Sequence, residues 1–463
     1  MRLSMALKIK PLLLATSIAL ILSGCGESVS SKNGVGHNQE SVNNPSTGGG
    51  DNSGGGDNSG GGDNSGGGDN SGGGDNSGGG DNGGAPAFSE SDLLVSLVDN
   101  VMTPAFVEFD SKTKNQPSLA QAYCDLESSY DPSMGDTSKS AELNEAKVAI
   151  QNAWKETMVS WQHAELMIVG PLLASDKSLR NQIYSWPNVS TCSVDQDVMF
   201  FANGNINGNA YDISNRSDKR RGLDAMEYLL FNENMAHSCS SNVANILSDW
   251  NTKSEQERKT LRCKYVVEVA KDLSDSATAL LFDWQGSDGY AAKFKNAGQP
   301  GNPYPTTLKA INEISDALFY MTEELKDYKL ATPLGLFDNK CGNIACSEEV
   351  ESIYAKHSIE NIRANIAAFE QIFIGGSTEN TGFDDFLDNN NASDTKEIML
   401  KGLTDAKTAA GEVSTDLQTA LNNDAAKVTQ THAKVKDVTD QLKNDFINKL
   451  ALELPKTSAG DND

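Results

Sequence analysis

The sequence predicts an all-α protein made of two packed antiparallel four-helix bundles, placed after a lipoprotein signal and a glycine-rich linker. Apolar residues beyond position 85 recur at helical spacing, strand-like alternation is almost absent, and short loops with Gly or Pro separate the helical stretches. Because residues 85–463 contain more helices than one four-helix core can hold, we expect two bundles in this region of 379 residues.

The N-terminus has the pattern of a signal peptide. Three basic residues precede an apolar run over residues 11–22, and small residues follow that run. A run of this length is too short to span a bilayer as a stable helix, so cleavage is favoured over anchoring. Residues 1–24 are therefore expected to be removed from an exported chain.

The residues around the expected cleavage site indicate a lipid anchor. Leu22-Ser23-Gly24-Cys25 resembles the bacterial lipobox, which implies a diacylglyceryl group on the Cys25 thiol. Gly26 follows the cysteine, whereas Asp at that place tends to retain lipoproteins in the inner membrane of Gram-negative cells. We therefore expect a lipid-anchored protein of the outer membrane, facing either the periplasm or the cell surface.

Residues 25–84 are typical of a flexible linker. From Asp51 the unit Asp-Asn-Ser-Gly-Gly-Gly occurs five times, and it offers no apolar residue to bury. A glycine-rich chain of this length has a root-mean-square reach of about 40 Å. The linker is therefore expected to hold the domain of residues 85–463 away from the membrane.

The charge of the chain excludes one class of partner. Without residues 1–24, 35 Lys and Arg remain against 64 Asp and Glu, which gives a net charge of −29. Such a surface repels phosphate backbones, so no nucleic acid is expected. The same charge either attracts cations or only keeps the domain soluble, and the sequence leaves both readings open.

Six cysteines remain after Cys25, and an even number in an exported chain predicts disulfides. Cys341 and Cys346 stand five residues apart and form the expected pair. The other four allow three pairings, which the sequence does not rank: Cys124, Cys192, Cys239 and Cys263. Zinc binding by the close pair is the alternative, although no second close pair or His pair accompanies it.

Within the domain, several stretches show an apolar stripe with helical period. The first follows Ser89, which has Asp92 three residues on, as in a capping box. A later stretch follows Ser358, which we expect to be its N-cap. Residues on the stripes are Leu93, Leu97 and Val101; Ile150, Trp154 and Trp161; Leu308, Ile311 and Leu318; and Ile359, Ile366 and Phe373.

One stretch combines an apolar helix with two acids. From Leu223 to Phe231 the chain is apolar except at Asp224 and Glu227, whose spacing of three puts both carboxylates on one helical face. Two buried carboxylates need a cation, an arginine or a shared proton. The alternative is that one faces solvent and the other caps a helix or pairs with Arg220 or Arg221.

The same stretch resembles the imelysin family, whose hallmark is Gly-x-His-x-x-Glu on a helix. The chain has Gly222 and Glu227 at the matching places, and its order of further segments is also similar. Those segments are residues 161–165 leading into Gly170-Pro171, residues 329–335, and Ser358 through Asn361 and Asn365 to Gly375 and Gly382. The resemblance implies two four-helix bundles with the motif near their junction, an exported or outer-membrane location, and a frequent association with iron acquisition.

Asp224 departs from the family pattern, because it stands where the motif has histidine. Asp with Glu suits calcium, manganese or ferric iron better than zinc. His163 is the best placed nitrogen donor, although a core or surface role for it is the alternative.

We therefore expect a lipoprotein that binds a metal ion or a small ligand, with an outer-membrane uptake component as partner. The alternative is an imelysin-type metallopeptidase, active or degenerate, for which the sequence offers neither His-Glu-x-x-His nor a serine nucleophile motif.

Overall fold

The computed structural model describes residues 88–243 and 245–455, which belong to one compact unit. The expected signal peptide, the lipidated Cys25 and the linker lie outside these residues, so they stay predictions. Within the described ranges, no helix combines the length and the apolar character needed to cross a membrane.

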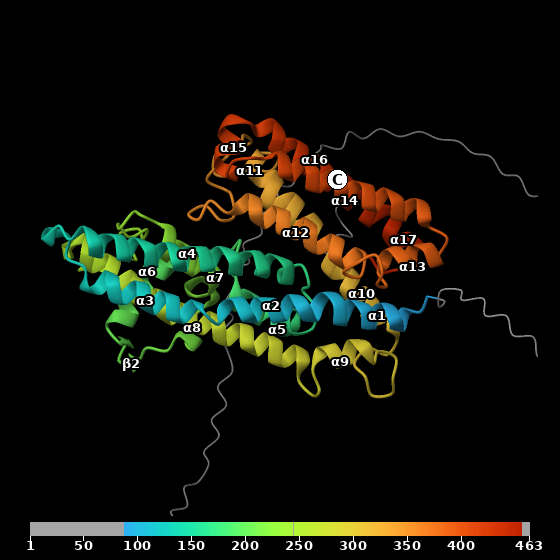
Figure 1. Ribbon diagram of the computed structural model, residues 1–463, viewed down its shortest axis with the longest axis horizontal. Coiled ribbons are helices and arrows are strands. Elements are labelled where there is room, and N and C mark those ends of the chain that lie inside the picture. The colour runs from blue at the N-terminus through green and yellow to red at the C-terminus, as the bar shows by residue number, and fades with distance from the viewer. Residues whose placement is uncertain (1–87, 244, 456–463) are drawn as a thin grey trace, which may run out of the picture. The chain divides into compact units, whose positions relative to one another are not determined.

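The first bundle contains the earlier helices, which run from blue to yellow-green in Figure 1. Its main helices are α1 (Glu90–Leu97), η1 (Val98–Met102), α2 (Thr103–Thr113), α3 (Gln116–Ser129), α4 (Thr137–Glu165), α7 (Gly222–Phe231) and α8 (Glu255–Gln285). Helices α2 and α3 pack against both α4 and α8, and α7 packs against α4 and α8. The chain from α1 to α2 is continuous because η1 is a π-helical turn between them.

Shorter elements surround this bundle. They are α5 (Ala174–Ile183), α6 (Thr191–Ala202) and α9 (Tyr290–Lys295), with the 3₁₀ turns η2 (Pro132–Met134), η3 (Gly170–Leu172), η4 (Ile213–Asn215), η5 (Asp218–Arg220), η6 (Asn245–Leu247) and η7 (Trp250–Thr252). The strands of the described residues are β1 (Asn205–Ile206) and β2 (Asn209–Ala210), which pair as an antiparallel hairpin. The near absence of strands predicted from the sequence is therefore confirmed.

The second bundle contains the later helices, orange to red in Figure 1. Its long members are α10 (Thr307–Leu318), the π-helical η8 (Met321–Ala331), α12 (Ser358–Phe373), α14 (Ser393–Glu412) and α16 (Ala425–Gln441). Shorter members are α11 (Thr332–Leu334), α13 (Phe383–Asn389), α15 (Leu417–Asn423), η9 (Leu442–Phe446) and α17 (Ile447–Lys449). Helix α14 packs against α12 and α16, and η8 packs against α12 and α16.

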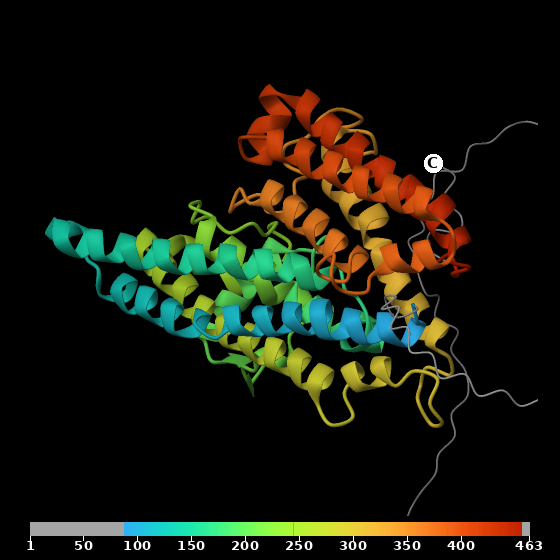
Figure 2. The same ribbon diagram turned by 45° about the vertical axis from the view of Figure 1, so that its right-hand side comes forward.

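The two bundles share one apolar core. Helix α12 lies along α4, as both views show (Figures 1 and 2), and α1 contacts α10. Buried side chains of both bundles belong to a single cluster, which includes Trp154 and Trp161 of α4 and Phe369 of α12. The tryptophans are thus core residues, and the predicted fold of two helical bundles is confirmed.

Two predicted helix starts had different outcomes. Ser89 is an N-cap, since its side chain accepts a hydrogen bond from the backbone N–H of Asp92. Ser358 is not the N-cap of its helix, because the helix begins at Ser358 and His357 occupies the cap position without a capping side-chain bond. The Ser358 hydroxyl instead accepts the backbone N–H of Ser352 and fixes the turn before α12.

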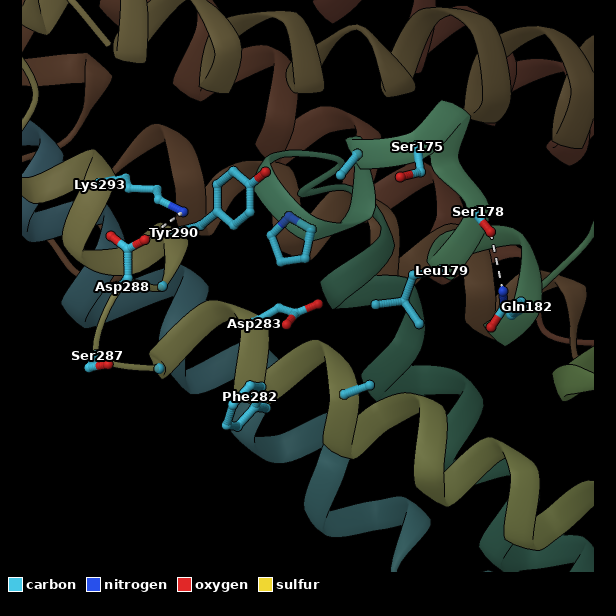
Figure 3. Close-up of a pocket in the computed structure, with 15 residues that line it drawn as sticks. Ser175, Ser178, Leu179, Gln182, Phe282, Asp283, Ser287, Asp288, Tyr290 and Lys293 are labelled. Carbon is cyan, nitrogen blue, oxygen red and sulfur yellow. Dashed lines mark hydrogen bonds and ion pairs between the residues drawn. The ribbon is translucent and has the colours of Figure 1, made fainter. Parts of the chain in front are cut away.

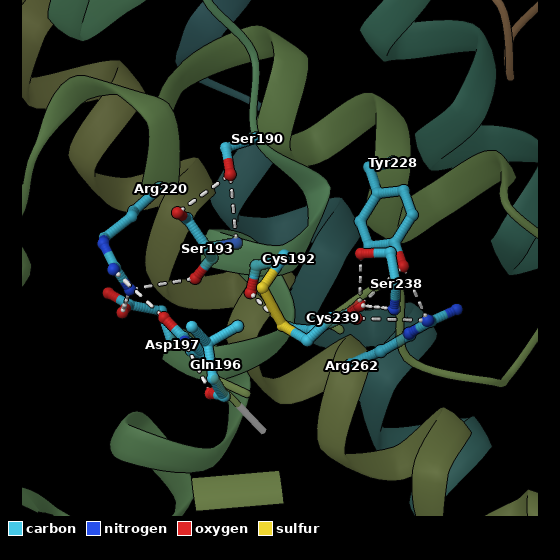
Figure 4. The surroundings of a disulfide bond; sticks show 12 residues. Ser190, Cys192, Ser193, Gln196, Asp197, Arg220, Tyr228, Ser238, Cys239 and Arg262 are labelled. Atoms are coloured by element: carbon cyan, nitrogen blue, oxygen red, sulfur yellow. Dashed lines mark hydrogen bonds and ion pairs between the residues drawn. A yellow bond between two sulfur atoms is a disulfide. The ribbon is translucent and has the colours of Figure 1, made fainter. Parts of the chain in front are cut away.

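The described residues form three disulfides. Cys341 pairs with Cys346, as expected, and the other four pair as Cys124–Cys263 and Cys192–Cys239. Figure 4 shows the Cys192–Cys239 bond, which joins the start of α6 to the segment after α7. Because all six sulfurs are in disulfides, the zinc alternative at the close pair is excluded in this structure.

Candidate functional site

Helix α7 carries the predicted acid pair and starts at a glycine that the packing requires. Gly222 has φ +79°, and a Cβ there would lie 2.5 Å from the carbonyl oxygen of Ile183. Asp224 and Glu227 follow in the first two turns and are 8% and 4% exposed. The prediction that both acids are buried on this helix therefore agrees with the structure.

Asp224 binds the turn that follows α5. Its Oδ1 accepts the backbone N–H of Ser185 at 3.1 Å, and its Oδ2 accepts the Ser185 hydroxyl at 2.8 Å. Burial raises the pKa of Asp224 to about 6, although the hydrogen bonds from Ser185 and the charge of Arg180 act in the opposite direction. The alternative of a pair with Arg220 or Arg221 is wrong, because those side chains bind Asp197 and Asp272.

Glu227 binds the segment that leads into the second bundle. Its Oε1 accepts the backbone N–H groups of Tyr354 at 2.8 Å and Ala355 at 3.0 Å. Burial raises the pKa of Glu227 to about 8, and the nearby carboxylates of Glu351 and Asp224 add to the rise. At neutral pH this side chain is therefore mostly protonated, and it connects α7 to the start of α12.

A second group of buried charges lies at the same junction and centres on Lys329 of η8. The Lys329 ammonium donates to Gln162 Oε1 at 2.5 Å and Asn365 Oδ1 at 2.9 Å, and it forms an ion pair with Glu351 at 2.9 Å. Its side chain is fully buried, and the rings of Trp186 and Tyr320 lie within 5.5 Å of the ammonium.

Two glutamates complete this group. Glu165 forms an ion pair with Arg180 and accepts the Tyr320 hydroxyl at 2.8 Å. Glu351 accepts hydrogen bonds from Tyr184, Gln162 and Asn361. Since α4, η8 and α12 all contribute, we call these residues the junction network: Gln162, Glu165, Arg180, Tyr184, Tyr320, Lys329, Glu351, Asn361 and Asn365.

Tyr184 connects the acid pair to the junction network. Its hydroxyl donates to Glu351, and its neighbour Ser185 donates to Asp224. The pKa of Tyr184 is raised well above its ordinary value, first by burial and then by the negative charges of Glu351, Glu165, Glu227 and Asp224. The two groups of charges therefore act on one another electrostatically.

His163 lies elsewhere on the junction. It lines a cleft of about 540 Å³ between α2, α4 and the end of α12, together with Ser160 and Gln371. Burial lowers the pKa of His163, while a hydrogen bond with Gln371 opposes that change, so the imidazole is neutral at pH 7. Asp224 and Glu227 are not among the residues of this cleft, so the structure does not bring the three predicted ligands together.

The comparisons with known proteins decide the family. The sequence model described as Imelysin (Peptidase_M75) matches residues 103–444. The chain belongs to the imelysin family.

Two solved structures share the imelysin fold with this chain. An imelysin-like protein from Psychrobacter arcticum 273-4 has 17% identity and a TM-score of 0.58, over 79% of this chain and 96% of its own. A "putative iron-regulated protein A precursor" from Parabacteroides distasonis ATCC 8503 has 16% identity and the same TM-score, over 79% of this chain and 97% of its own. No curated protein matches the sequence.

The Gly170-Pro171 segment of the imelysin pattern has a packing role here. Gly170 has φ +52°, a Cβ on it would lie 2.8 Å from the ring of Tyr290, and its N–H donates to Glu313 at 2.9 Å. Gly170 begins the 3₁₀ turn η3, and Pro171 is its second residue. These residues therefore fix the turn that follows α4. No hydrogen bond in the described residues connects them to the acid pair.

The residues present do not form a ready metal centre. Across residues 88–243 and 245–455, no three or more side chains of His, Cys, Asp or Glu gather in a way that could hold a metal ion. Both oxygens of Asp224 and one oxygen of Glu227 already accept protein hydrogen bonds. A resident metal at this imelysin motif would therefore need the acid pair to exchange its present partners.

The junction network was missed at the level of single residues, although a signal for it exists. Lys329 continues the apolar stripe of Leu318, Met321 and Leu325, and Glu165 continues that of Trp154, Met158 and Trp161. A charged residue in register with an apolar stripe must be buried and must find a partner. From the sequence, Glu165 and Lys329 contributed only to the resemblance to the imelysin family.

Proposed function

We propose that this imelysin-like protein is a non-hydrolytic binding protein of the cell envelope, which takes up a small polar ligand or a cation at the junction of its two bundles. The observation that carries the proposal is the acid pair itself. Asp224 and Glu227 are buried side by side on α7, and in the described residues neither forms an ion pair with Lys or Arg. An incoming cation or hydrogen-bond donor would stabilise these two carboxyl groups, for which the fold provides no Lys or Arg partner.

A further acceptor supports a polar ligand at the junction. Asn361 of the junction network is fully buried, and its Oδ1 accepts no hydrogen bond within the described residues. Buried acceptors without a donor are rare in folded proteins, so such an atom is available to a ligand.

Iron is the first metal to test. The Parabacteroides relative is named as iron-regulated, and oxygen ligands such as carboxylates suit ferric iron, manganese and calcium. We further propose that lipid on Cys25 holds the chain at the outer membrane, where an uptake component would be its partner. Detergent partitioning of wild type and Cys25→Ser tests the anchor, and equal partitioning of the two would remove it from the proposal.

Calorimetric titration of the full-length protein tests ligand binding. Calcium, manganese and ferric iron are titrated separately into wild type and Asp224→Asn/Glu227→Gln, and we expect binding in wild type and its loss in the double variant. The matched control is Asp437→Asn/Asp440→Asn, which removes two acids with the same spacing from the surface of α16. Binding that survives in the Asp224/Glu227 variant, or no binding in wild type, would contradict the cation form of the proposal.

The metallopeptidase alternative rests on the family's name alone. The sequence resemblance puts Asp224 where the family motif has histidine, and the described residues hold no group of three metal-binding side chains. A peptide-cleavage assay with and without chelator separates the two functions. Cleavage that chelator abolishes, and that Glu227→Gln also abolishes, would establish the peptidase and refute the binding-only proposal.

A further inference from the structure

A groove runs along α8 on the side that faces α5, and neither Asp224 nor Glu227 lines it. It consists of two adjoining hollows of about 580 Å³ and about 420 Å³, which share Leu179, Gln182 and Ala279. Figure 3 shows the larger hollow, with Asp283 of α8 pointing toward the space below α5. The α8 residues that line the groove follow helical spacing, so one face of α8 forms its floor: Glu268, Asp272, Asp275, Ala279 and Asp283.

The middle of the groove is apolar. Leu179 of α5 and Ala279 of α8 lie there, and Phe282 lines the same hollow with 73% of its surface exposed. A phenylalanine ring so open to water contributes little to the fold, whereas burial of that ring against a partner would be favourable. The ring is therefore a candidate anchor for a bound molecule.

The acidic side chains of the floor give the groove an excess of negative charge. Asp272 is paired with Arg221, and Asp288 lies 4.0 Å from Lys293. Glu268, Asp275 and Asp283 form no ion pair in the described part of the chain, and they face Lys271 as the remaining cation. A complementary partner would therefore present positive charge next to apolar side chains.

The wall opposite α8 is held in an unusual conformation. Ser175, Asp176 and Lys177 have φ of +52°, +55° and +62°, a left-handed turn without glycine. Such backbone persists only where the surroundings enforce it, and it is concentrated at binding and catalytic sites. Here it places Ser175 at the edge of the groove, beside the Tyr290 ring that packs on Gly170.

We propose that this groove binds a short basic segment of a partner protein. Lys or Arg side chains would pair with Asp275 and with Asp283, the second next to the Phe282 ring, and the apolar side chains of the segment would cover Leu179 and Phe282. The negative charge of the whole chain would speed the encounter with such a segment. The groove shares no residue with the junction network, so this inference is independent of the proposed ligand site.

Fluorescence anisotropy with a labelled Lys-Leu-Lys-Leu-Lys-Leu-Lys peptide and the full-length protein tests the proposal. We expect Phe282→Ala to weaken binding about tenfold, because a central aromatic anchor is lost. Asp275→Asn/Asp283→Asn should weaken binding by a similar factor and reduce its dependence on salt.

Two controls separate the groove from general attraction to an acidic protein. Phe337→Ala removes an exposed ring outside the groove, and Asp437→Asn/Asp440→Asn removes the same charge from α16. Both should bind the peptide as wild type does. The proposal is overturned if these controls weaken binding as much as the groove variants, if wild type does not bind the peptide, or if a Glu-Leu peptide binds equally well. Binding of an uncharged dextran oligomer that Phe282→Ala abolishes, without salt dependence, would assign the groove to a saccharide instead.

Discussion

The acid pair and the junction network bury negative charge in two different ways. In the network, Glu165 and Glu351 lie against Arg180 and Lys329, so each carboxylate has a cationic partner. On α7, Glu227 has only backbone N–H donors, and burial raises its pKa to about 8. The network is thus neutralised by ion pairs and Glu227 by a proton. A site neutralised by a proton can exchange that proton for another cation, whereas a site filled by Lys329 cannot.

The largest expected effect comes from the network. Lys329→Met should lower the free energy of unfolding by about 3–5 kcal/mol, because Glu351 would remain buried without its cation. Urea denaturation measures the change. Lys401→Met is the matched control, since Lys401 forms an ion pair with Asp405 on the exposed surface of α14 and should contribute at most about 0.5 kcal/mol. Equal losses of unfolding free energy in the two variants would mean that the Lys329 ammonium does not stabilise the junction network.

A pH series distinguishes neutralisation by a proton from neutralisation by an ion pair. The pKa of Glu227 rises from 4.5 in the unfolded chain to about 8 in the fold, so the folded state binds more protons between these values. Its contribution to stability is therefore complete below pH 4.5 and is lost as the pH rises through 8. Glu227→Gln keeps a neutral acceptor and lacks this loss.

Relative to wild type, Glu227→Gln should therefore gain up to about 1.4 kcal/mol per pH unit across that window. Thermal melts from pH 4.5 to 8.5 measure the gain, and Asp437→Asn on the surface of α16 should follow the wild-type curve. A constant difference between Glu227→Gln and wild type over the whole series would show that Glu227 is ionised throughout.

The smallest effect tests how the acid pair is positioned. Gly222→Ala should cost about 2 kcal/mol, because Ala disfavours φ +79° and its Cβ would meet the carbonyl oxygens of Ile183 and Gln182. Gly411→Ala, at a helical position with no atom within 4 Å, should leave stability unchanged or slightly higher. Urea denaturation of both variants provides the measurement. A stable Gly222→Ala protein would show that the turn after α5 can move away from α7.

The sequence predicted the fold because helical periodicity is a local signal. The stripes that begin at Leu93, Ile150, Leu308 and Ile359 all lie on buried helix faces in the structure. The prediction that Ser358 is an N-cap was wrong. Its hydroxyl accepts a hydrogen bond from the backbone N–H of Ser352 instead. Capping by sequence pattern therefore fails where a preceding turn competes for the same side chain.

The site was only partly predictable, since its partners are distant in sequence. The burial of Asp224 and Glu227 followed from the apolar residues around them, but Ser185 lies 39 residues before Asp224 and Tyr354 lies 127 residues after Glu227. No local pattern encodes these contacts. His163 was grouped with the acids because it lies in the segment before Gly170-Pro171, and the fold turns it toward a separate cleft. The identity of any ligand stays a prediction.

The disulfides are unevenly distributed along the domain. Among the described residues, all three bonds lie between Cys124 and Cys346, and Cys124–Cys263 closes a loop of 139 residues in the first bundle. Closure of so long a loop removes conformational entropy from the unfolded chain. In the chain-entropy account this raises the free energy of the unfolded state by about 5 kcal/mol. Helices α12 to α17 have no such bond, and α12 packs on α4. Reduction of Cys124–Cys263 and Cys192–Cys239 would therefore loosen the unfolded chain of the first bundle, whereas it would remove no crosslink from helices α12 to α17.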